Sequence, residues 1–279
     1  MKKNTEPEFI NSPLNNPMPN YSVYRMGKAE SVLAWLVAFL LGGLTGLVFY
    51  GDLFKADGEK TIATYISNIV VFVIVGILAA KFLVPMYVQS KLEQQKNKIK
   101  SQFCDMLESL TSSFSSGSNV IKAFESAAND LRMQYSENDF IIREMDEILA
   151  GVAQNISIEE MLKNFGDRSG NEDISSFADI FEICYRKGSD MQSAIYRTHS
   201  VITEKIAISD EIETKLTSNK MQHNVMSLMP IALVAMLRAT NDSFAESFTS
   251  PAGVVVNTIA IGIFIGAYKY GLKIVNIKG

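Results

Sequence analysis

Two groups of carboxylates are the residues of this chain whose types and spacing could do chemistry. One group is Glu144, Asp146 and Glu147, and the other is Glu159 with Glu160. Paired carboxylates can work as general acid and base, and clusters of them can hold a cation. The same spacing is more typical of the solvated face of an amphipathic helix. We therefore interpret both groups as surface.

No other set of residues indicates catalysis or cofactor binding. His199 and His223 have no metal-ligand spacing to each other or to a cysteine. Glycines 42, 43 and 46 do not form a phosphate-binding loop, because they lie inside an apolar segment. The sequence predicts no catalytic residue, no metal and no cofactor, and hence a protein that is not an enzyme.

Cys104 and Cys184 are the two cysteines, and both fall in helix-patterned sequence. They could form a disulfide or supply a reactive thiol. The preference of cysteine for protein cores favours a third interpretation, two small buried hydrophobic residues.

Four apolar stretches in two pairs dominate the chain and cover residues 31–50, 65–86, 221–237 and 254–272. A charge-free helix of roughly 20 residues crosses a bilayer. The third stretch has the shortest apolar core and contains Pro230, so we expect a cytoplasmic helix to run into it, with re-entrant or tilted insertion as the alternative. The expected fold is an all-α membrane protein whose transmembrane hairpins, residues 31–86 and 221–272, flank a helical domain at 87–220.

The remaining segments are a polar, proline-containing tail at residues 1–30, expected to be disordered at its start, and a short tail at 273–279. We expect no cleavable signal peptide, because no small-residue cleavage site follows the first apolar run.

The distribution of lysine and arginine predicts the topology. These residues gather in the first 30 residues, after the second apolar stretch and at the C-terminus, whereas acidic residues offset them in the two loops within the pairs. Basic flanks mark the cytoplasmic side. Both termini and the central domain are therefore expected in the cytoplasm. Lys81 and Lys269 lie near that side and can snorkel, so they do not indicate an ion path.

Small residues recur at four-residue spacing in two of the apolar stretches. Gly42 with Gly46, and Gly262 with Gly266, would each permit close approach of another helix.

The central domain is acidic and helix-patterned. Residues 87–222 carry a net charge of −7, which argues against a nucleic-acid partner. An apolar stripe runs to residue 114, Gly117 ends that helix, and Ser118 or Asn119 caps the next. Further helices are predicted at 138–152, 158–165, 173–187 and from 190, the second of them started by Ser157 and Glu160. Together they make a bundle of six antiparallel helices.

A repeated corner suggests that the bundle consists of two halves. Gly117, Ser118 and Ala123 recur 71 residues later as Gly188, Ser189 and Ala194. In each corner glycine ends a helix and alanine lets the next pack closely. Coincident turn chemistry is the alternative.

These corners, at residues 102–131 and 157–195, and the tract from Pro230 to the end resemble the type II secretion F family. The one-domain layout looks most like its short Tad (Flp) pilus-assembly members of the TadB type. The resemblance implies a non-catalytic platform in the bacterial inner membrane that couples a cytoplasmic ATPase to pilin extraction and filament assembly. Its implied partners are the ATPase, a paralogous platform subunit, pilin-like subunits and the lipid bilayer, in a homo- or hetero-oligomer.

The rival interpretations are a membrane transporter subunit and a membrane-tethered helical signalling adaptor. If the chain is a platform, its acidic domain should attract a basic partner. We expect Glu144, Glu147 and Glu159 to be exposed and to face the ATPase.

Overall fold

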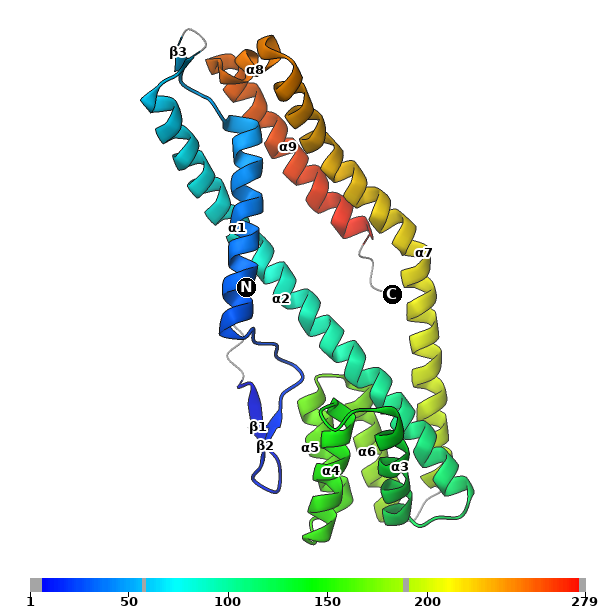
Figure 1. Ribbon diagram of the computed structural model, residues 1–279. Helices are drawn as coiled ribbons and strands as arrows, with labels where there is room; N and C mark the ends of the chain where they lie inside the picture. Colours follow the sequence, from blue (N-terminus) through cyan, green and yellow to red (C-terminus); the bar gives the residue numbers. More distant parts are fainter. Residues whose placement is uncertain (1–6, 57–58, 188–190, 276–279) are drawn as a thin grey trace. The chain divides into compact units, whose positions relative to one another are not determined.

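The computed structural model describes residues 7–56, 59–187 and 191–275. Its elements in chain order are β1 (Phe9–Asn11), β2 (Pro17–Pro19), α1 (Lys28–Tyr50), β3 (Lys55–Ala56), β4 (Glu59–Lys60), α2 (Ile62–Ser115), α3 (Val120–Gln134), α4 (Phe140–Ala153), α5 (Ile158–Ser169), α6 (Glu172–Lys187), α7 (Met191–Thr240), α8 (Asp242–Thr249) and α9 (Pro251–Val275) (Figure 1). Strands form only two short antiparallel pairs among these residues, β1 with β2 and β3 with β4. The predicted all-α membrane-protein class is confirmed.

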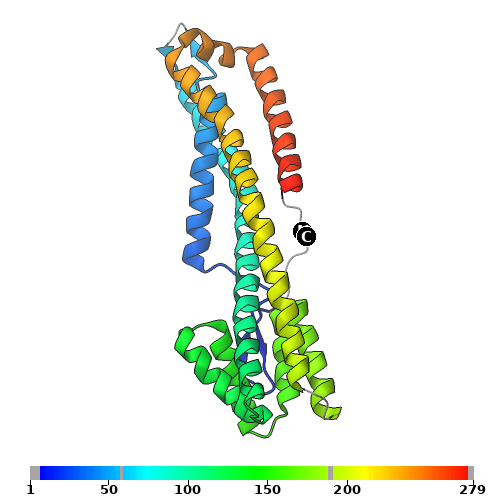
Figure 2. The ribbon, with the colours of Figure 1, turned by 90° about the vertical axis from the view of Figure 1, so that its right-hand side faces the viewer.

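The chain divides into two compact units. The membrane unit comprises Met26–Tyr87 and Ser209–Gly279, and the bundle unit comprises Met1–Arg25 and Val88–Ile208. Helices α2 and α7 belong to both units, and they pass Pro85 and Pro230 without a break (Figure 2).

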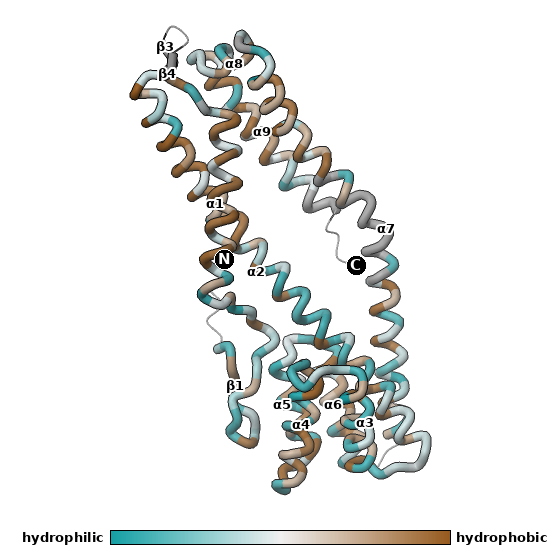
Figure 3. Tube along the Cα trace, viewed as in Figure 1, coloured by the Kyte–Doolittle hydropathy of each residue, from teal (hydrophilic) through white to brown (hydrophobic). Residues whose placement is uncertain are grey.

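Three helices of the described residues, α1, α2 and α9, are long and apolar enough to cross a membrane. Figure 3 shows that apolar residues cover α1 and the first part of α2, whereas hydrophilic residues follow in the middle of α2. The third predicted span corresponds to a shorter apolar stretch of α7, Val225–Thr240. The loop after it, for which we predicted no structure, contains α8, capped by the Asn241 side chain accepting from Phe244 N at 3.0 Å.

Close packing of α1 on α2 depends on glycine. A Cβ added to Gly42 would lie 2.2 Å from Cβ of Ala79, and one added to Gly46 would lie 2.9 Å from Cβ of Val75. Real Cβ atoms never approach so closely, so both positions require a hydrogen in place of a side chain. The predicted contact at this glycine pair is confirmed. A Cβ added to Gly262 or Gly266, the second pair, on α9, would have no atom of another described segment within 4 Å.

Polar side chains of α7 and α9 donate hydrogen bonds to carbonyl oxygens at the C-terminal end of α1. Arg238 donates from Nη1 to Val48 O at 2.6 Å and from Nη2 to Gly51 O at 2.7 Å. The buried Asn257 donates from Nδ2 to Phe49 O at 2.9 Å. These donors satisfy carbonyls that a helix end leaves free, and a cation there is favoured by the helix dipole.

The bundle is built from α3 to α6 with the end of α2 and the start of α7. Phe103 of α2 is fully buried, and its ring makes edge contacts with Phe165 of α5 at 6.0 Å and Phe177 of α6 at 5.3 Å. Each helix supplies one apolar stripe to this core, as the spacing predicts. Helices α3 to α6 begin and end within a few residues of the predicted limits.

The first predicted corner has the expected backbone. Gly117 has φ 82°, in the left-handed region, and Asn119 caps α3 by accepting from Lys122 N at 2.9 Å. The cap is therefore Asn119 and not Ser118. Ala123 is buried in the core as predicted. Of the second corner, only Ala194 lies in the described residues, half-buried in α7; the positions of glycine 188 and serine 189 lie outside them.

Replacement of this glycine tests the corner. Gly117→Val should lower the free energy of unfolding of the bundle by about 1–2 kcal/mol, because a β-branched residue is strained at positive φ. A Cβ there would meet nothing within 4 Å, so the effect is conformational and not steric. Gly117→Asn, which tolerates this region better, should cost less. Equal stability of the wild type and the valine variant in thermal unfolding of the purified protein would contradict the assignment.

Candidate functional site

The N-terminal segment, residues 7–25, is ordered and packs into the bundle unit; we call it the strap. Strands β1 and β2 pair with Phe9 opposite Pro19. After them, Tyr21 is fully buried and Val23 nearly so. The tail was expected to be disordered at its start, and residues 1–6, where it starts, lie outside the described residues. Residues 7–25 add a few apolar side chains to a core formed elsewhere in the sequence.

A buried ion pair lies beneath the strap. Arg168 of α5 and Glu144 of α4 are 2% and 1% exposed at their side chains and pair through two bonds, Nη1 to Oε1 at 2.8 Å and Nη2 to Oε2 at 2.6 Å. Tyr21 adds a third bond, from its hydroxyl to Glu144 Oε1 at 2.8 Å. Arg168 also donates to Pro19 O at 3.1 Å and to Asn164 Oδ1 at 2.7 Å. The two buried charges thus satisfy each other and are bonded on several sides.

Burial and charge set the protonation of this cluster. Burial raises the pKa of the Tyr21 hydroxyl, and the neighbouring Glu144 carboxylate raises it further. Burial alone would lower the pKa of Arg168, but its bonds to Glu144 more than offset this effect, and the pKa is raised. The arginine is charged and the tyrosine neutral at physiological pH, so Tyr21 acts as a donor to the carboxylate.

Glu147 holds the turn of the strap. It is 9% exposed. Ser12 Oγ donates to its Oε1 at 2.5 Å, and Asn16 Nδ2 lies 3.2 Å and 3.1 Å from its two oxygens.

Our expectation that Glu144 and Glu147 are exposed is therefore wrong. Glu144 falls on the stripe of α4 that carries Ile141, Met145 and Ile148 into the core. Arg168 likewise continues the buried stripe of α5 that contains Leu162 and Phe165. A charge at a core-facing position of a helix was thus readable in the sequence as a sign of a buried pair.

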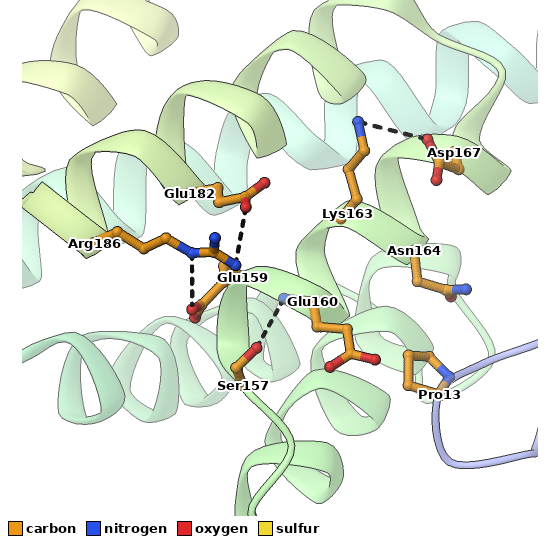
Figure 4. Close-up of a pocket in the computed structure, with 9 residues that line it drawn as sticks. All are labelled: Pro13, Ser157, Glu159, Glu160, Lys163, Asn164, Asp167, Glu182 and Arg186. Carbon is orange, nitrogen blue, oxygen red and sulfur yellow. Dashed lines mark hydrogen bonds and ion pairs between the residues drawn. The ribbon is translucent and has the colours of Figure 1, made fainter.

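Glu159 lies in a separate pocket on α5 and α6, with a volume of about 420 Å³ (Figure 4). Pro13, from the turn of the strap, also lines the pocket, and the other lining residues are polar and mostly charged: Ser157, Glu160, Lys163, Asn164, Asp167, Glu182 and Arg186. Four carboxylates face two cations, so the pocket is acidic. Ser157 starts α5 as predicted, its hydroxyl accepting from Glu160 N at 3.4 Å.

Glu159 is the most enclosed acid of this pocket. Its side chain is 12% exposed, and Arg186 Nε lies 3.9 Å from its Oε1. Its Oε2 is buried and has no hydrogen-bond partner among the described residues. Arg186 lies between Glu159 and Glu182 and pairs with Glu182 at 3.0 Å (Figure 4). The arrangement can recognise a basic group by charge.

The third interpretation of the cysteines, small buried hydrophobic residues, holds for Cys104 and only in part for Cys184. Both are free, so the disulfide alternative is wrong. Cys104 is buried, and its sulfur lies 3.2 Å from Thr203 Oγ1. Burial raises the pKa of the Cys104 thiol, which disfavours the reactive thiolate. Cys184 is half-buried.

Comparison with known proteins gives one family match, which covers part of the chain. Residues 106–239, from the end of α2 to the end of α7, match the model of the family described as type II secretion system (T2SS), protein F. No curated protein and no solved structure gives a match. The matched region contains both Glu144 and Arg168 and the whole α5–α6 pocket apart from the strap. The chain therefore contains a domain that matches the type II secretion system protein F family over residues 106–239.

Proposed function

We propose that this protein is an inner-membrane platform of a type II secretion or type IV pilus assembly machine of the Tad (Flp) kind, with no catalysis of its own. The observation that carries the proposal is the family match over the bundle, since the family has a platform role in such machinery. The single bundle between two sets of apolar helices supports a short Tad-type member. In this role the protein couples a cytoplasmic ATPase to pilin extraction, beside a paralogous platform subunit.

The charge distribution supports a bundle on the cytoplasmic side of the membrane. Lysines cluster at residues 91–100, directly after the second apolar stretch, and again in the N-terminal segment before α1. Basic flanks are retained on the cytoplasmic side. The ATPase would then meet the bundle and not the loops within each hairpin.

The pocket on α5 and α6 is the face that we propose for the ATPase. It retains Glu159 from the expected set, while the buried Glu144 and Glu147 cannot serve. Glu160 and Asp167 are exposed at its rim. A basic side chain of the partner would be attracted by the excess of carboxylates and could bond the unpartnered oxygen of Glu159. Association should weaken as salt is raised.

Charge reversal tests this face. Glu160→Lys with Asp167→Lys in the full chain should reduce co-purification of the ATPase at least ~10-fold, as expected for the loss of complementary charge at an interface. Filament assembly should fail while the protein level in the membrane stays normal.

The matched control is Glu125→Lys with Glu137→Lys, which changes the charge equally at exposed positions outside the pocket. This control should bind the ATPase normally. Equal behaviour of the two double variants would contradict the proposed face. Normal assembly in cells that lack the whole protein would contradict the platform role itself.

A further inference from the structure

The strap is held to the bundle more by polar bonds than by apolar burial. Between residues 7 and 25 only Met18, Tyr21 and Val23 are buried hydrophobic residues. Ordering a segment of this length costs roughly 1–2 kcal/mol per residue in backbone entropy. Three apolar side chains offset a small part of such a cost. The docking of the strap must therefore depend on its hydrogen bonds.

Those bonds converge on the Arg168–Glu144 pair. The strap contributes the Tyr21 hydroxyl to Glu144 and the Pro19 carbonyl to Arg168. The backbone adds Tyr21 N donating to Arg168 O at 2.9 Å. Gln95 of α2 donates to the Tyr21 and Val23 carbonyls at 3.3 Å. The strap thus covers the Arg168–Glu144 pair, and hydrogen bonds to this pair attach the strap to the bundle.

The strap continues almost directly into the first membrane helix. It ends at Arg25, and α1 begins at Lys28. A docked strap leaves only Met26 and Gly27 between the bundle unit and α1. With the strap undocked, α2 and α7 would be the direct connections from the bundle unit to the membrane unit.

We propose that the strap is a link, held on the bundle by the Arg168–Glu144 pair, that couples the bundle to the first membrane helix. Docking of the strap stands on the geometry alone, and its part in filament assembly rests on the proposed platform function. Loss of one charge should open the strap before it unfolds the bundle. A buried charge left without its partner is strongly unfavourable, and lifting the strap returns that charge to water while the aromatic core stays packed.

Hydrogen exchange of the full-length protein in lipid nanodiscs tests the docking. In the Arg168→Met variant, amides between residues 8 and 23 should exchange about 100-fold faster or more, the scale expected when one partner of a buried pair is removed. Amides of α3, which does not touch the strap bonds described above, should be unchanged.

Two further variants separate the pair from general destabilisation. Arg132→Met, a substitution of the same kind outside the strap and the pocket, removes the exposed ion pair of Arg132 on α3 with Asp146 on α4 and should leave the strap protected. Arg168→Met combined with Glu144→Met removes both buried charges together with the partners of the Tyr21 hydroxyl and the Pro19 carbonyl, so the bundle should stay folded while the strap stays loosened.

The outcomes decide the proposal. Unchanged strap exchange in Arg168→Met, or equal loosening of α3, would overturn it. A released strap together with normal filament assembly would overturn the coupling while leaving the platform role intact. A released strap with impaired assembly in both Arg168→Met and the double variant, over a bundle that stays folded, is the expected result.

Discussion

Phe103→Ala is expected to lower the free energy of unfolding of the bundle by about 3–5 kcal/mol. The ring lies between α2, α5 and α6 and contacts the rings of Phe165 and Phe177. Alanine would remove these contacts and leave a cavity that the flanking helices can fill only in part. Amides of α5 and α6 that exchange through unfolding of the bundle should exchange on the order of 100-fold faster or more in the full-length protein.

Met133→Ala is the control for this core position. Met133 is 81% exposed on α3, and its truncation should change the stability by less than about 0.5 kcal/mol. If the two variants destabilise the bundle equally, the aromatic cluster around Phe103 is not its core.

Gly42→Ala should have a large effect in the membrane unit. The added methyl group would lie 2.2 Å from Cβ of Ala79 and 3.1 Å from the Val75 carbonyl oxygen, so α1 and α2 must move apart. Overpacking of this kind costs about 1–3 kcal/mol. We expect a lower midpoint of thermal unfolding for the purified protein in detergent.

The chain offers both a control and a rescue for this variant. Gly262→Ala places the same methyl group in a membrane helix where nothing lies within 4 Å, so it should not destabilise the protein. Gly42→Ala with Ala79→Gly returns the missing space and should recover most of the loss. Failure of the rescue, or an equal loss in Gly262→Ala, would show that the close contact of α1 with α2 does not set the stability.

The helices could be predicted because their signals are local. Apolar runs, stripes at helical spacing, Ser157 as a cap and Gly117 as a stop act within a few residues of the sequence. The same holds for the glycine pair of α1, whose partner helix follows directly in the chain. Local patterns did not reveal α8, a helix of eight residues in a loop between two apolar stretches.

The burial of Glu144 and Arg168 could be read from their core-facing positions, but their bonds to the strap could not be predicted from local patterns because those partners lie far away in the sequence. Tyr21 is 123 residues from Glu144, and Ser12 is 135 residues from Glu147. An acidic residue on a helix reads as solvated unless the fold supplies its partner. The strap itself was missed for the same reason, since its few apolar residues are buried only against a bundle that comes later in the chain. Glu159 was expected to be exposed as well, whereas its side chain is only 12% exposed and its Oε2 is buried.

Single cysteines that report the side of the membrane test the central claim most directly. In a protein with Cys104 and Cys184 replaced by alanine, cysteines are placed at Lys55, Ala150 and Ser243, in the first hairpin loop, α4 and α8. A membrane-impermeant maleimide is applied to spheroplasts before and after permeabilisation. A platform that receives a cytoplasmic ATPase requires positions 55 and 243 to react at once and position 150 to react only after permeabilisation. Labelling of position 150 in intact spheroplasts would contradict the account.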